Sequence, residues 1–379
     1  MSIKIEIEKN YLILVQLESN KSLEFPIIWL RDNCQCHECF DKVTSSRKID
    51  WETFNLNKGT LRDAKFDAAE LRLEINWSNE HSSCFDFLWL KGIFTRRSGQ
   101  LLEIFYQQPK ELWSKSHFET AFAKFNFSKC DKVFLNWLQH MAVHGIALIE
   151  NTPNTSKEVA ERVGFIKKAH YGDEFTVTNK EQTTTFAYTT SKLQLHVDIP
   201  YYDQMPGVNM LHCVTQSEAG GENTLVDGFY VAELLRQQYP RHFDVLTRVK
   251  VNWSDYGVEH DDEHVALLRA PVINVDDVGN VTRINYNNNT QRDSFFTVSI
   301  DDVALWYEAF AQFIELMHGE IAKFTLEGNI LTFDNVRVLR GRDAYSDCSY
   351  NSRCVVGVNV DWYQMFLKWK VFKRKLQAS

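Results

Sequence analysis

The pattern of hydrophobic and polar residues changes about a third of the way along the chain of 379 residues. The first 90 residues alternate apolar and charged side chains in runs such as KIEIEKNYLILVQL, EFPIIWL and KFDAAELRLEINW, which predicts short strands separated by turns. From about residue 130, helical spacing in DKVFLNWLQHMAVHG and TSKEVAERVGFIKKA flanks the apolar strand IALIE. Further strands are predicted for TFAY, VNMLHCV, VTRINY, ILTFDNVRVLR and CVVGVNVDW.

A long amphipathic helix is predicted within SIDDVALWYEAFAQFIELMHGE. Ser299 is the expected cap, and one face of the helix carries Val303, Trp306, Phe310, Phe313 and Met317. Many strands with a few helices on one side indicate an α+β fold, which we expect to be a curled sheet or jelly roll. The change of pattern predicts a small β-rich domain over residues 1–92, a partly helical connection over 93–128 and a larger domain over 129–379.

Composition and charge narrow the classes of function. The chain is 44% hydrophobic and 13% aromatic, which is typical of a globular protein. Its net charge is −8 and its one basic cluster is KWKVFKRK near the end, so nucleic acid is not an expected partner. The first residues lack the pattern of a signal or transit peptide, and no apolar run is long enough to cross a membrane. We therefore expect an intracellular protein with no membrane partner.

Three cysteines, Cys34, Cys36 and Cys39, crowd into NCQCHEC. Thiolates are good zinc ligands, and a structural zinc site takes four nitrogen or sulfur ligands. The fourth could be His81 or Cys84 from elsewhere in the fold, whereas His37 is crowded between two of the cysteines. The alternative is that these are buried or solvent-facing thiols that bind no metal.

His196 and Asp198 form an H-x-D pattern at an expected strand end, in LQLHVDIPYYD. Alternate residues of a strand point to the same face, so both side chains can reach one ion. A hydrogen-bonded His–Asp pair is the more frequent explanation of this pattern. A non-haem Fe(II) oxygenase would need a second histidine from a distant strand.

Seven ordered motifs carry a family resemblance: WLRDNC-C--C with the later EH, AYTT-KL--H-D-P, PGV--LHC, GG----VDGF, RIN--N, TFDN-R-L-GR--Y and SR. The chain thereby resembles the gamma-butyrobetaine dioxygenase family, which includes trimethyllysine dioxygenase and taurine dioxygenase-like enzymes. The resemblance implies a double-stranded β-helix preceded by a zinc-binding domain with ligands Cys34, Cys36, Cys39 and His81. It also implies iron ligands His196 and Asp198, with Arg353 binding 2-oxoglutarate.

The same resemblance implies Fe(II), Zn(II), 2-oxoglutarate and ascorbate as cofactors, a small-molecule substrate and a homodimer. It favours a cytoplasmic location, with mitochondria as the alternative. The substrate-binding positions fall on Tyr171, Phe175, Tyr188, Asn285 and Asn287. Ile199 and Asn359 replace two tyrosines of the aromatic cage and Phe175 replaces a tryptophan, so the cage is thinned; Tyr201 or Tyr202 could compensate.

Arg340 breaks the family pattern, because the resemblance places the second iron-binding histidine there. A guanidinium has no lone pair for a metal and adds positive charge. Possible replacement ligands are Asp343, Cys348, His212 and Cys213, and Arg340 could instead pair directly with Asp198. The function that we expect is an Fe(II)/2-oxoglutarate-dependent hydroxylase of a trimethylammonium-bearing acid, of the carnitine-biosynthesis type. The alternatives are an impaired paralogue that binds ligands or partners, and an oxygenase for another small substrate.

Overall fold

The computed structural model describes residues 2–17, 21–48, 60–97, 109–127, 130–152, 155–179, 186–259, 262–288, 291–295, 299–347 and 352–378. The chain forms two compact units, Met1–Glu103 and Ile104–Ser379, each with its own core. None of the described helices has the length and apolar character needed to cross a membrane.

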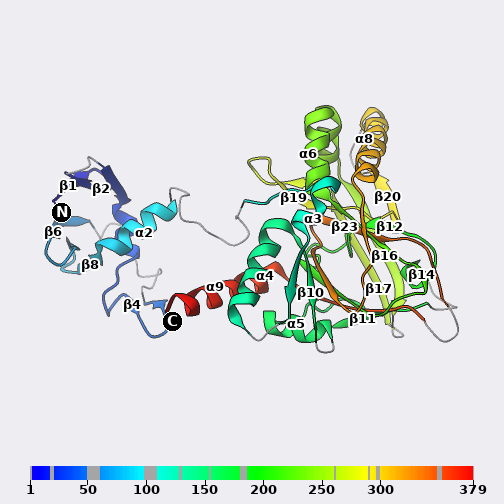
Figure 1. Cartoon of the computed structure of the whole chain (residues 1–379). Helices are drawn as coiled ribbons and strands as arrows, with labels where there is room; N and C mark the ends of the chain where they lie inside the picture. The colour runs from blue at the N-terminus through cyan, green and yellow to red at the C-terminus, as the bar shows by residue number, and fades with distance from the viewer. Residues whose placement is uncertain are drawn as a thin grey trace. The chain divides into compact units, whose positions relative to one another are not determined.

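The N-terminal unit contains two three-stranded antiparallel sheets (Figure 1). One consists of β1 (Ile3–Glu8), β2 (Tyr11–Gln16) and β3 (Lys21–Pro26), the other of β6 (Leu61–Asp67), β7 (Arg72–Trp77) and β8 (Ser82–Asp86). Alternate residues of the strands, such as Leu73, Ile75 and Trp77, are fully buried, as the sequence pattern predicts. The unit is completed by the pair β4 (Phe40–Asp41) and β5 (Ser46–Arg47) and the helices α1 (Ile27–Asp32) and α2 (Phe87–Arg97).

The larger unit contains a six-stranded and a four-stranded sheet, which share a core as in a jelly roll. The six-stranded sheet has the order β11 (Glu174–Val177), β25 (Cys354–Val360), β13 (Val208–Thr215), β22 (Ile330–Asp334), β10 (Ile146–Glu150), β9 (Ala123–Asn126). The other has the order β12 (Leu193–His196), β23 (Val338–Arg342), β15 (Asn223–Asp227), β21 (Ala322–Phe324). Buried side chains such as Leu211 and Leu225 come from different sheets and belong to one cluster. The predicted α+β, double-stranded β-helix fold is confirmed.

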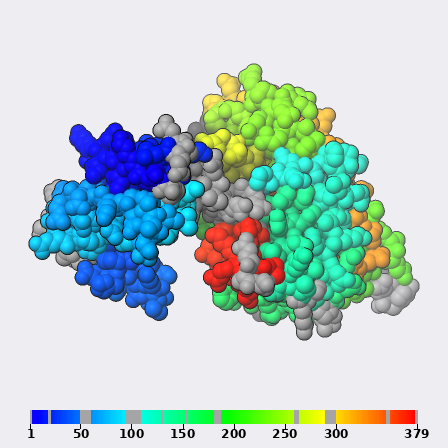
Figure 2. Space-filling view, turned by 60° about the vertical axis from the view of Figure 1, so that its left-hand side comes forward, coloured from blue at the N-terminus to red at the C-terminus, as the bar shows by residue number. Residues whose placement is uncertain are grey.

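Helices cover this unit in two groups. One group is α4 (Asp131–His144), α5 (Ser156–Val163) and α9 (Trp362–Ala378), whose apolar faces form a second cluster; α9 (red) is visible at the surface in Figure 2. The other is α6 (Gly228–Gln238), α7 (Pro240–Arg248) and α8 (Ile300–Gly319), which pack in a third. The short helices are η3 (Lys115–His117), α3 (Phe118–Ala121) and η4 (Phe186–Tyr188).

Three small sheets complete the unit. A three-stranded sheet has the order β17 (Asp262–Ala270), β16 (Val251–Glu259), β20 (Gln291–Phe295). Two pairs are β18 (Ile273–Val275) with β19 (Val281–Ile284), and β14 (Ala219–Gly220) with β24 (Tyr345–Ser346).

Most predicted elements are confirmed. Ser299 caps α8 by accepting a hydrogen bond from the Asp302 N–H at 3.0 Å, and α4 ends at Gly145, whose φ of 73° suits glycine. Two predictions are wrong. The run EFPIIWL is a strand only to Pro26 and then becomes α1, because proline suits a helix start and cannot extend a sheet ladder. The described part of TFAY is a 3₁₀ turn, not a strand.

The segment ILTFDNVRVLR is two strands, β22 and β23, with a turn between them. Strand β9 comes from the segment predicted to connect the domains and pairs with β10. The division at residues 92 and 128 stays a prediction.

Candidate active site and metal-ligand clusters

The pairing of β12 with β23 builds the centre of the site. His196 is the last residue of β12, and its Cα partner on β23 is Arg340. The turn between β22 and β23 positions Asp198, because the Asn335 side chain accepts from the Asp198 N–H at 2.8 Å and donates to its carbonyl at 2.9 Å. The H-x-D pair therefore lies next to Arg340, which is far away in the sequence.

Arg340 binds Asp198 directly. Its Nη2 lies 3.0 Å from Asp198 Oδ1 and 3.2 Å from Oδ2, and His196 Nε2 lies 3.2 Å from the same Oδ1. The buried Asn209 side chain also donates to Asp198 Oδ2. Burial raises the pKa of Asp198, but attraction to Arg340 and the hydrogen bond with His196 outweigh it, and the pKa falls well below the usual range.

These side chains do not fit Fe(II). The facial triad needs three donor atoms, and the guanidinium offers none while occupying both carboxylate oxygens. Within the described ranges, no third His, Cys, Asp or Glu joins His196 and Asp198 in a metal-sized group. Of the proposed replacements, Asp343 instead pairs with Lys323 at 2.6 Å, and Cys348 lies outside the described residues.

A second arginine group lies nearby. Arg353 is 4% exposed and donates through Nε to Gln216 Oε1 at 3.2 Å, and its guanidinium lies 5.5 Å from the centroid of the Tyr345 ring. Arg342 packs on the same ring at 4.5 Å and donates through Nη2 to the carbonyls of two residues, Thr189 and Ser191, at 2.7 Å each.

Burial and mutual repulsion make this group a candidate anion site. Burial, followed by repulsion from Arg353, lowers the pKa of Arg342 to about 10, and burial also lowers that of Arg353. The Nε of Arg342 is buried and has no hydrogen-bond partner among the described residues. A carboxylate would relieve the repulsion and accept from this donor, so the group fits 2-oxoglutarate. The sequence analysis missed Arg342, although its position two residues after Arg340 puts it on the same face of β23.

The predicted substrate-binding residues are three aromatic residues and two asparagines. Tyr171 lies against Phe175 at 5.0 Å between ring centroids, and its hydroxyl accepts from Asn359 Nδ2 at 2.6 Å. Burial raises the pKa of Tyr171, and the Asp198 charge raises it further, which associates Tyr171 with the centre of the site. Tyr188 lies in η4 and is half-buried.

The two predicted asparagines differ. Asn285 is fully buried, donates to the Pro200 carbonyl at 2.7 Å and accepts from Asn274 at 3.0 Å, which fixes it in the scaffold. Asn287 forms a β-bridge with His196 and so lies beside the centre. Ile199 is buried in a left-handed conformation, with φ of 57°, directly after Asp198.

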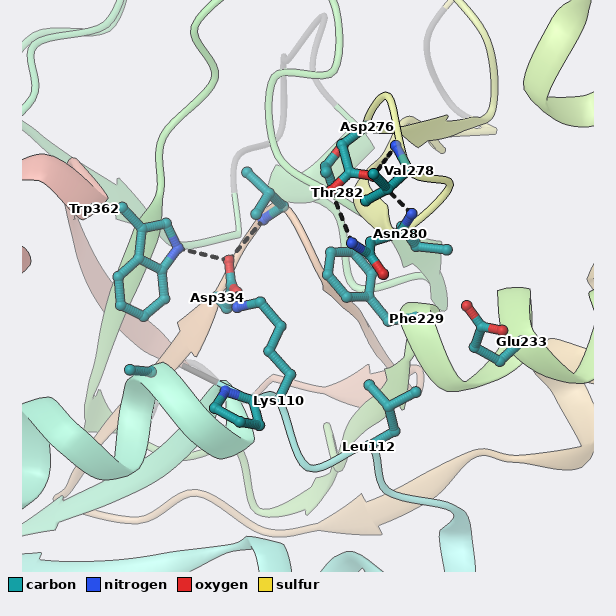
Figure 3. A pocket seen from close by; sticks show the side chains of 14 residues that line it. Lys110, Leu112, Phe229, Glu233, Asp276, Val278, Asn280, Thr282, Asp334 and Trp362 are labelled. Carbon is teal, nitrogen blue, oxygen red and sulfur yellow. Dashed lines mark hydrogen bonds and ion pairs between the residues drawn. The ribbon is translucent and has the colours of Figure 1, made fainter. Parts of the chain in front are cut away.

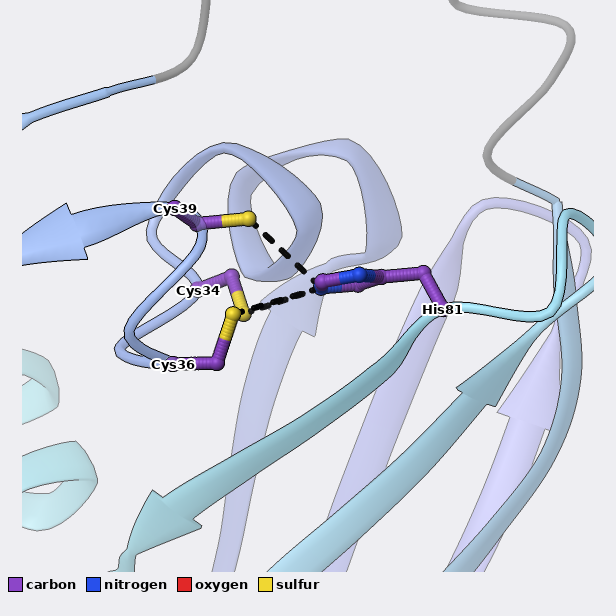
Figure 4. Close-up of side chains that lie close together, drawn as sticks. All are labelled: Cys34, Cys36, Cys39 and His81. Atoms are coloured by element: carbon purple, nitrogen blue, oxygen red, sulfur yellow. Dashed lines mark hydrogen bonds between the residues drawn. The ribbon is translucent and has the colours of Figure 1, made fainter.

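The N-terminal unit brings its four predicted zinc ligands together (Figure 4). Nε2 of His81 lies 3.4, 3.7 and 3.5 Å from Sγ of Cys34, Cys36 and Cys39. Sulfur and nitrogen ligands of one tetrahedral zinc ion are separated by about 3.6 Å, so the cluster fits Zn²⁺. Burial raises the pKa of Cys34 to about 12, and a bound cation would favour its thiolate. His81 belongs to this group of possible ligands, whereas His37 and Cys84 do not.

A separate cavity of about 820 Å³ lies elsewhere in the larger unit (Figure 3). Asp334 is fully buried at its wall, accepts from Trp362 Nε1 at 2.9 Å and lies 3.7 Å from Lys110 Nζ. Burial raises the pKa of Asp334 and lowers that of Lys110. None of the residues predicted from the sequence lines this cavity.

The jelly roll, the H-x-D strand end and the buried arginines define the class. Residues 110–357 match the model of the "Taurine catabolism dioxygenase TauD, TfdA family", and residues 6–91 match "Gamma-butyrobetaine hydroxylase-like, N-terminal". Dioxygenases of this class depend on Fe(II) and 2-oxoglutarate.

Named relatives make the assignment more specific. Human gamma-butyrobetaine dioxygenase is 32% identical over 93% of this chain and 92% of its own length. The enzyme of the same name from Pseudomonas is 30% identical over 92% of this chain and 91% of its own length. Human mitochondrial trimethyllysine dioxygenase is 29% identical over 89% of this chain and 80% of its own length. The chain belongs to the gamma-butyrobetaine dioxygenase family.

Proposed function

We propose that this chain binds 2-oxoglutarate and a small trimethylammonium-bearing acid, the ligands of a carnitine-type hydroxylase, and that its hydroxylase turnover is strongly reduced. The observation that carries the proposal is the ion pair between Arg340 and Asp198, at 3.0 Å. This ion pair keeps a positive charge, the Arg340 guanidinium, at the centre of the site, but it provides no ligand for iron.

Binding of 2-oxoglutarate is supported by the buried guanidiniums. Arg353 would hold the distal carboxylate, since a planar guanidinium can donate to both of its oxygens. The charge of Arg353 helps to lower the pKa of Arg342, so the two guanidiniums lie close enough to repel each other, and a bound dianion would offset both charges. Arg340 adds a third positive charge where the bound acid would approach Asp198.

Binding of a cationic substrate is supported by aromatic rings and amide oxygens. The Tyr171 and Phe175 rings lie together and provide aromatic faces for a quaternary ammonium. The side-chain oxygens of Asn209 and Asn359 are buried without a hydrogen-bond partner among the described residues, which suits partial negative charge facing a ligand. Asn287 and Tyr188 are the other proposed contacts, whereas the bonds of Asn285 favour a supporting role.

Reduced turnover follows from the chemistry of position 340. In this family iron supplies the activation of dioxygen, and here the residues present hold a guanidinium instead. Loss of an outer-shell partner costs about 10–100-fold in metal affinity or activity, so loss of a ligand should cost at least as much.

The experiment combines binding with turnover. Calorimetry would measure 2-oxoglutarate and gamma-butyrobetaine binding, and succinate would be measured with Fe(II), ascorbate and dioxygen, for wild type and Arg340→His. We expect both proteins to bind both acids and the variant to form at least about tenfold more succinate. Wild-type succinate that equals the variant's and accompanies carnitine would contradict reduced turnover. Failure of folded, zinc-loaded wild type to bind either acid would contradict the proposed ligands.

An oxygenase for a different small substrate is the second candidate. It is favoured by Asn359, which stands where the family has an aromatic cage residue and bonds to Tyr171. Products formed from other small amines but not from the betaine would support it.

The remaining proposals come from the family. We infer a zinc ion at Cys34, Cys36, Cys39 and His81, ascorbate as reductant, a homodimer and a cytoplasmic location. One relative is named as mitochondrial, which keeps that compartment as the alternative.

A further inference from the structure

We propose that His170, Asp255 and His264 form a metal site of their own, which takes a divalent first-row transition ion such as Zn²⁺. The three residues offer two imidazole nitrogens and one carboxylate oxygen, and these ligand atoms all lie within 4.8 Å of one another. This donor set suits zinc and its neighbours better than Ca²⁺ or Mg²⁺, which prefer oxygen ligands alone. The proposal does not depend on the proposed function, since it involves neither Arg340 nor the H-x-D pair.

The pairing of β16 with β17 brings two of the proposed ligands, Asp255 and His264, together. On β16 and β17, Gly257 pairs with His264, and Asp255 is two positions from Gly257 on the same face. His264 Nε2 lies 3.0 Å from Asp255 Oδ2. Neighbouring nitrogen and oxygen ligands of one tetrahedral zinc ion are separated by about 3.3–3.5 Å, so these two atoms would need to move apart by only about 0.3–0.5 Å to hold an ion between them.

The third ligand comes from the loop between α5 and β11. The ring of His170 stacks on that of His264, with 4.2 Å between centroids and 19° between planes. The lone pairs of imidazole nitrogens lie in the ring plane, so the rings must turn out of this stack to bind one ion. Their ligand atoms lie within 4.8 Å of one another, which leaves such a turn as the one change required. His170 Nδ1 lies 3.2 Å from the Tyr202 hydroxyl, the type of outer contact that orients a metal-bound imidazole.

Gly257 gives the His264 ring its space. A Cβ at this position would lie 2.7 Å from Cε1 of His264, closer than real Cβ contacts allow. The Nδ1 of His264 is buried and has no hydrogen-bond partner among the described residues. The hydrogen bond to Asp255 uses Nε2 and therefore does not account for this buried nitrogen.

The alternative is that the three residues form only a hydrogen bond and a stack. Full-length protein with zinc in its cysteine cluster would be dialysed against micromolar Zn²⁺ and its metal content measured. We expect two zinc ions in wild type and one in His264→Gln and His170→Gln, with at least about tenfold weaker binding of the second ion. His318→Gln, on the last turn of α8, is the matched control and should keep both ions.

Spectroscopy identifies the ligands. Co²⁺ added to the zinc-loaded protein should give d–d bands without thiolate charge transfer, and these should vanish in His264→Gln. One ion per wild-type chain would overturn the proposal. Loss of the second ion in His196→Gln, but not in His264→Gln, would also overturn it by placing that ion at the H-x-D pair. Circular dichroism shows whether His264→Gln folds. If it does not, the same measurements are made on His170→Gln, whose substitution lies in a loop.

Discussion

The guanidinium of Arg340 reaches both carboxylate oxygens of Asp198, at 3.0 and 3.2 Å. The register of β12 and β23 makes the contact possible, because Arg340 is the Cα partner of His196, two residues before Asp198. An ion pair between chain residues therefore lies at the position that we predict for the iron site.

Arg340→His should increase Fe(II) affinity and 2-oxoglutarate decarboxylation by at least about tenfold, because it restores a donor atom and removes a competing cation. Anaerobic Fe(II) titration and succinate formation measure the two effects. Arg340→Gln is the control, since it removes the charge without adding an imidazole. Equal iron affinity in wild type and Arg340→His would show that another residue completes the site.

Arg340→Met should lower the free energy of unfolding by about 3 kcal/mol at pH 7, because it removes the guanidinium that pairs with the Asp198 carboxylate, which is 14% exposed. Arg340 depresses the pKa of Asp198 in the folded state, so the pair stabilises the protein above the unfolded pKa and less as the pH falls. The difference between the two proteins should shrink in acid. Urea unfolding at pH 7 and at about pH 2, below the unfolded pKa of the carboxyl, measures it. A difference independent of pH would mean that Arg340 acts through packing on Phe333 instead.

Arg353→Lys should weaken 2-oxoglutarate binding by about 10–100-fold, since lysine cannot donate to both oxygens of one carboxylate. Isothermal titration calorimetry measures the affinity. Arg248→Lys changes an exposed arginine of α7 and should leave it unchanged. An unaltered affinity in Arg353→Lys would move the anion site elsewhere.

Cys39→Ser should release zinc and unfold the N-terminal unit at lower temperature, because it removes a ligand of the proposed tetrahedral site. Metal analysis and calorimetric melting measure both effects. Cys84→Ser alters an exposed thiol outside the cluster and should change neither. Zinc content equal in both variants would exclude the cluster as the metal site.

Asp227→Asn should destabilise the larger unit by about 3–5 kcal/mol, the usual effect of leaving one buried charge unpaired. Both side chains of the pair are fully buried, and Arg337 donates to Asp227 through Nε at 3.0 Å and Nη2 at 2.8 Å. Asp244→Asn breaks an exposed pair with Arg248 and should cost less than about 1 kcal/mol. Urea unfolding measures both variants. An equal loss of stability in Asp227→Asn and Asp244→Asn would contradict the expectation that burial makes the first pair more costly to break.

Sequence patterns could predict the elements whose local signals agree with their burial. The α8 helix has its cap and apolar face in one continuous segment, and β7 alternates buried and exposed residues. The secondary structure of EFPIIWL and TFAY was harder to predict, because these short apolar runs suit either a strand or a short helix. Local propensity there is overridden by what the neighbouring chain requires.

The site residues that belong to a family motif could be predicted from the sequence, whereas most other residues of the site could not. The ligand positions and the break at position 340 follow from aligned motifs, and the ion pair with Asp198 was one of the stated alternatives. The approach of Arg342, Asn209 and the His170 group depends on strand register and on a loop conformation. Asn209 and His170 leave no such signal in a single sequence, since they lie 131 and 170 positions before Arg340, whereas the two-residue spacing of Arg342 from Arg340 is a signal that could have been used.

A central cation that is part of the polypeptide has a physiological consequence. Chelators cannot withdraw Arg340, and neither iron scarcity nor oxidation of ferrous ions changes its charge. Occupancy of the proposed ligand site would then follow the concentrations of its two acids alone. Binding of the two proposed acids would therefore continue under iron starvation and low oxygen.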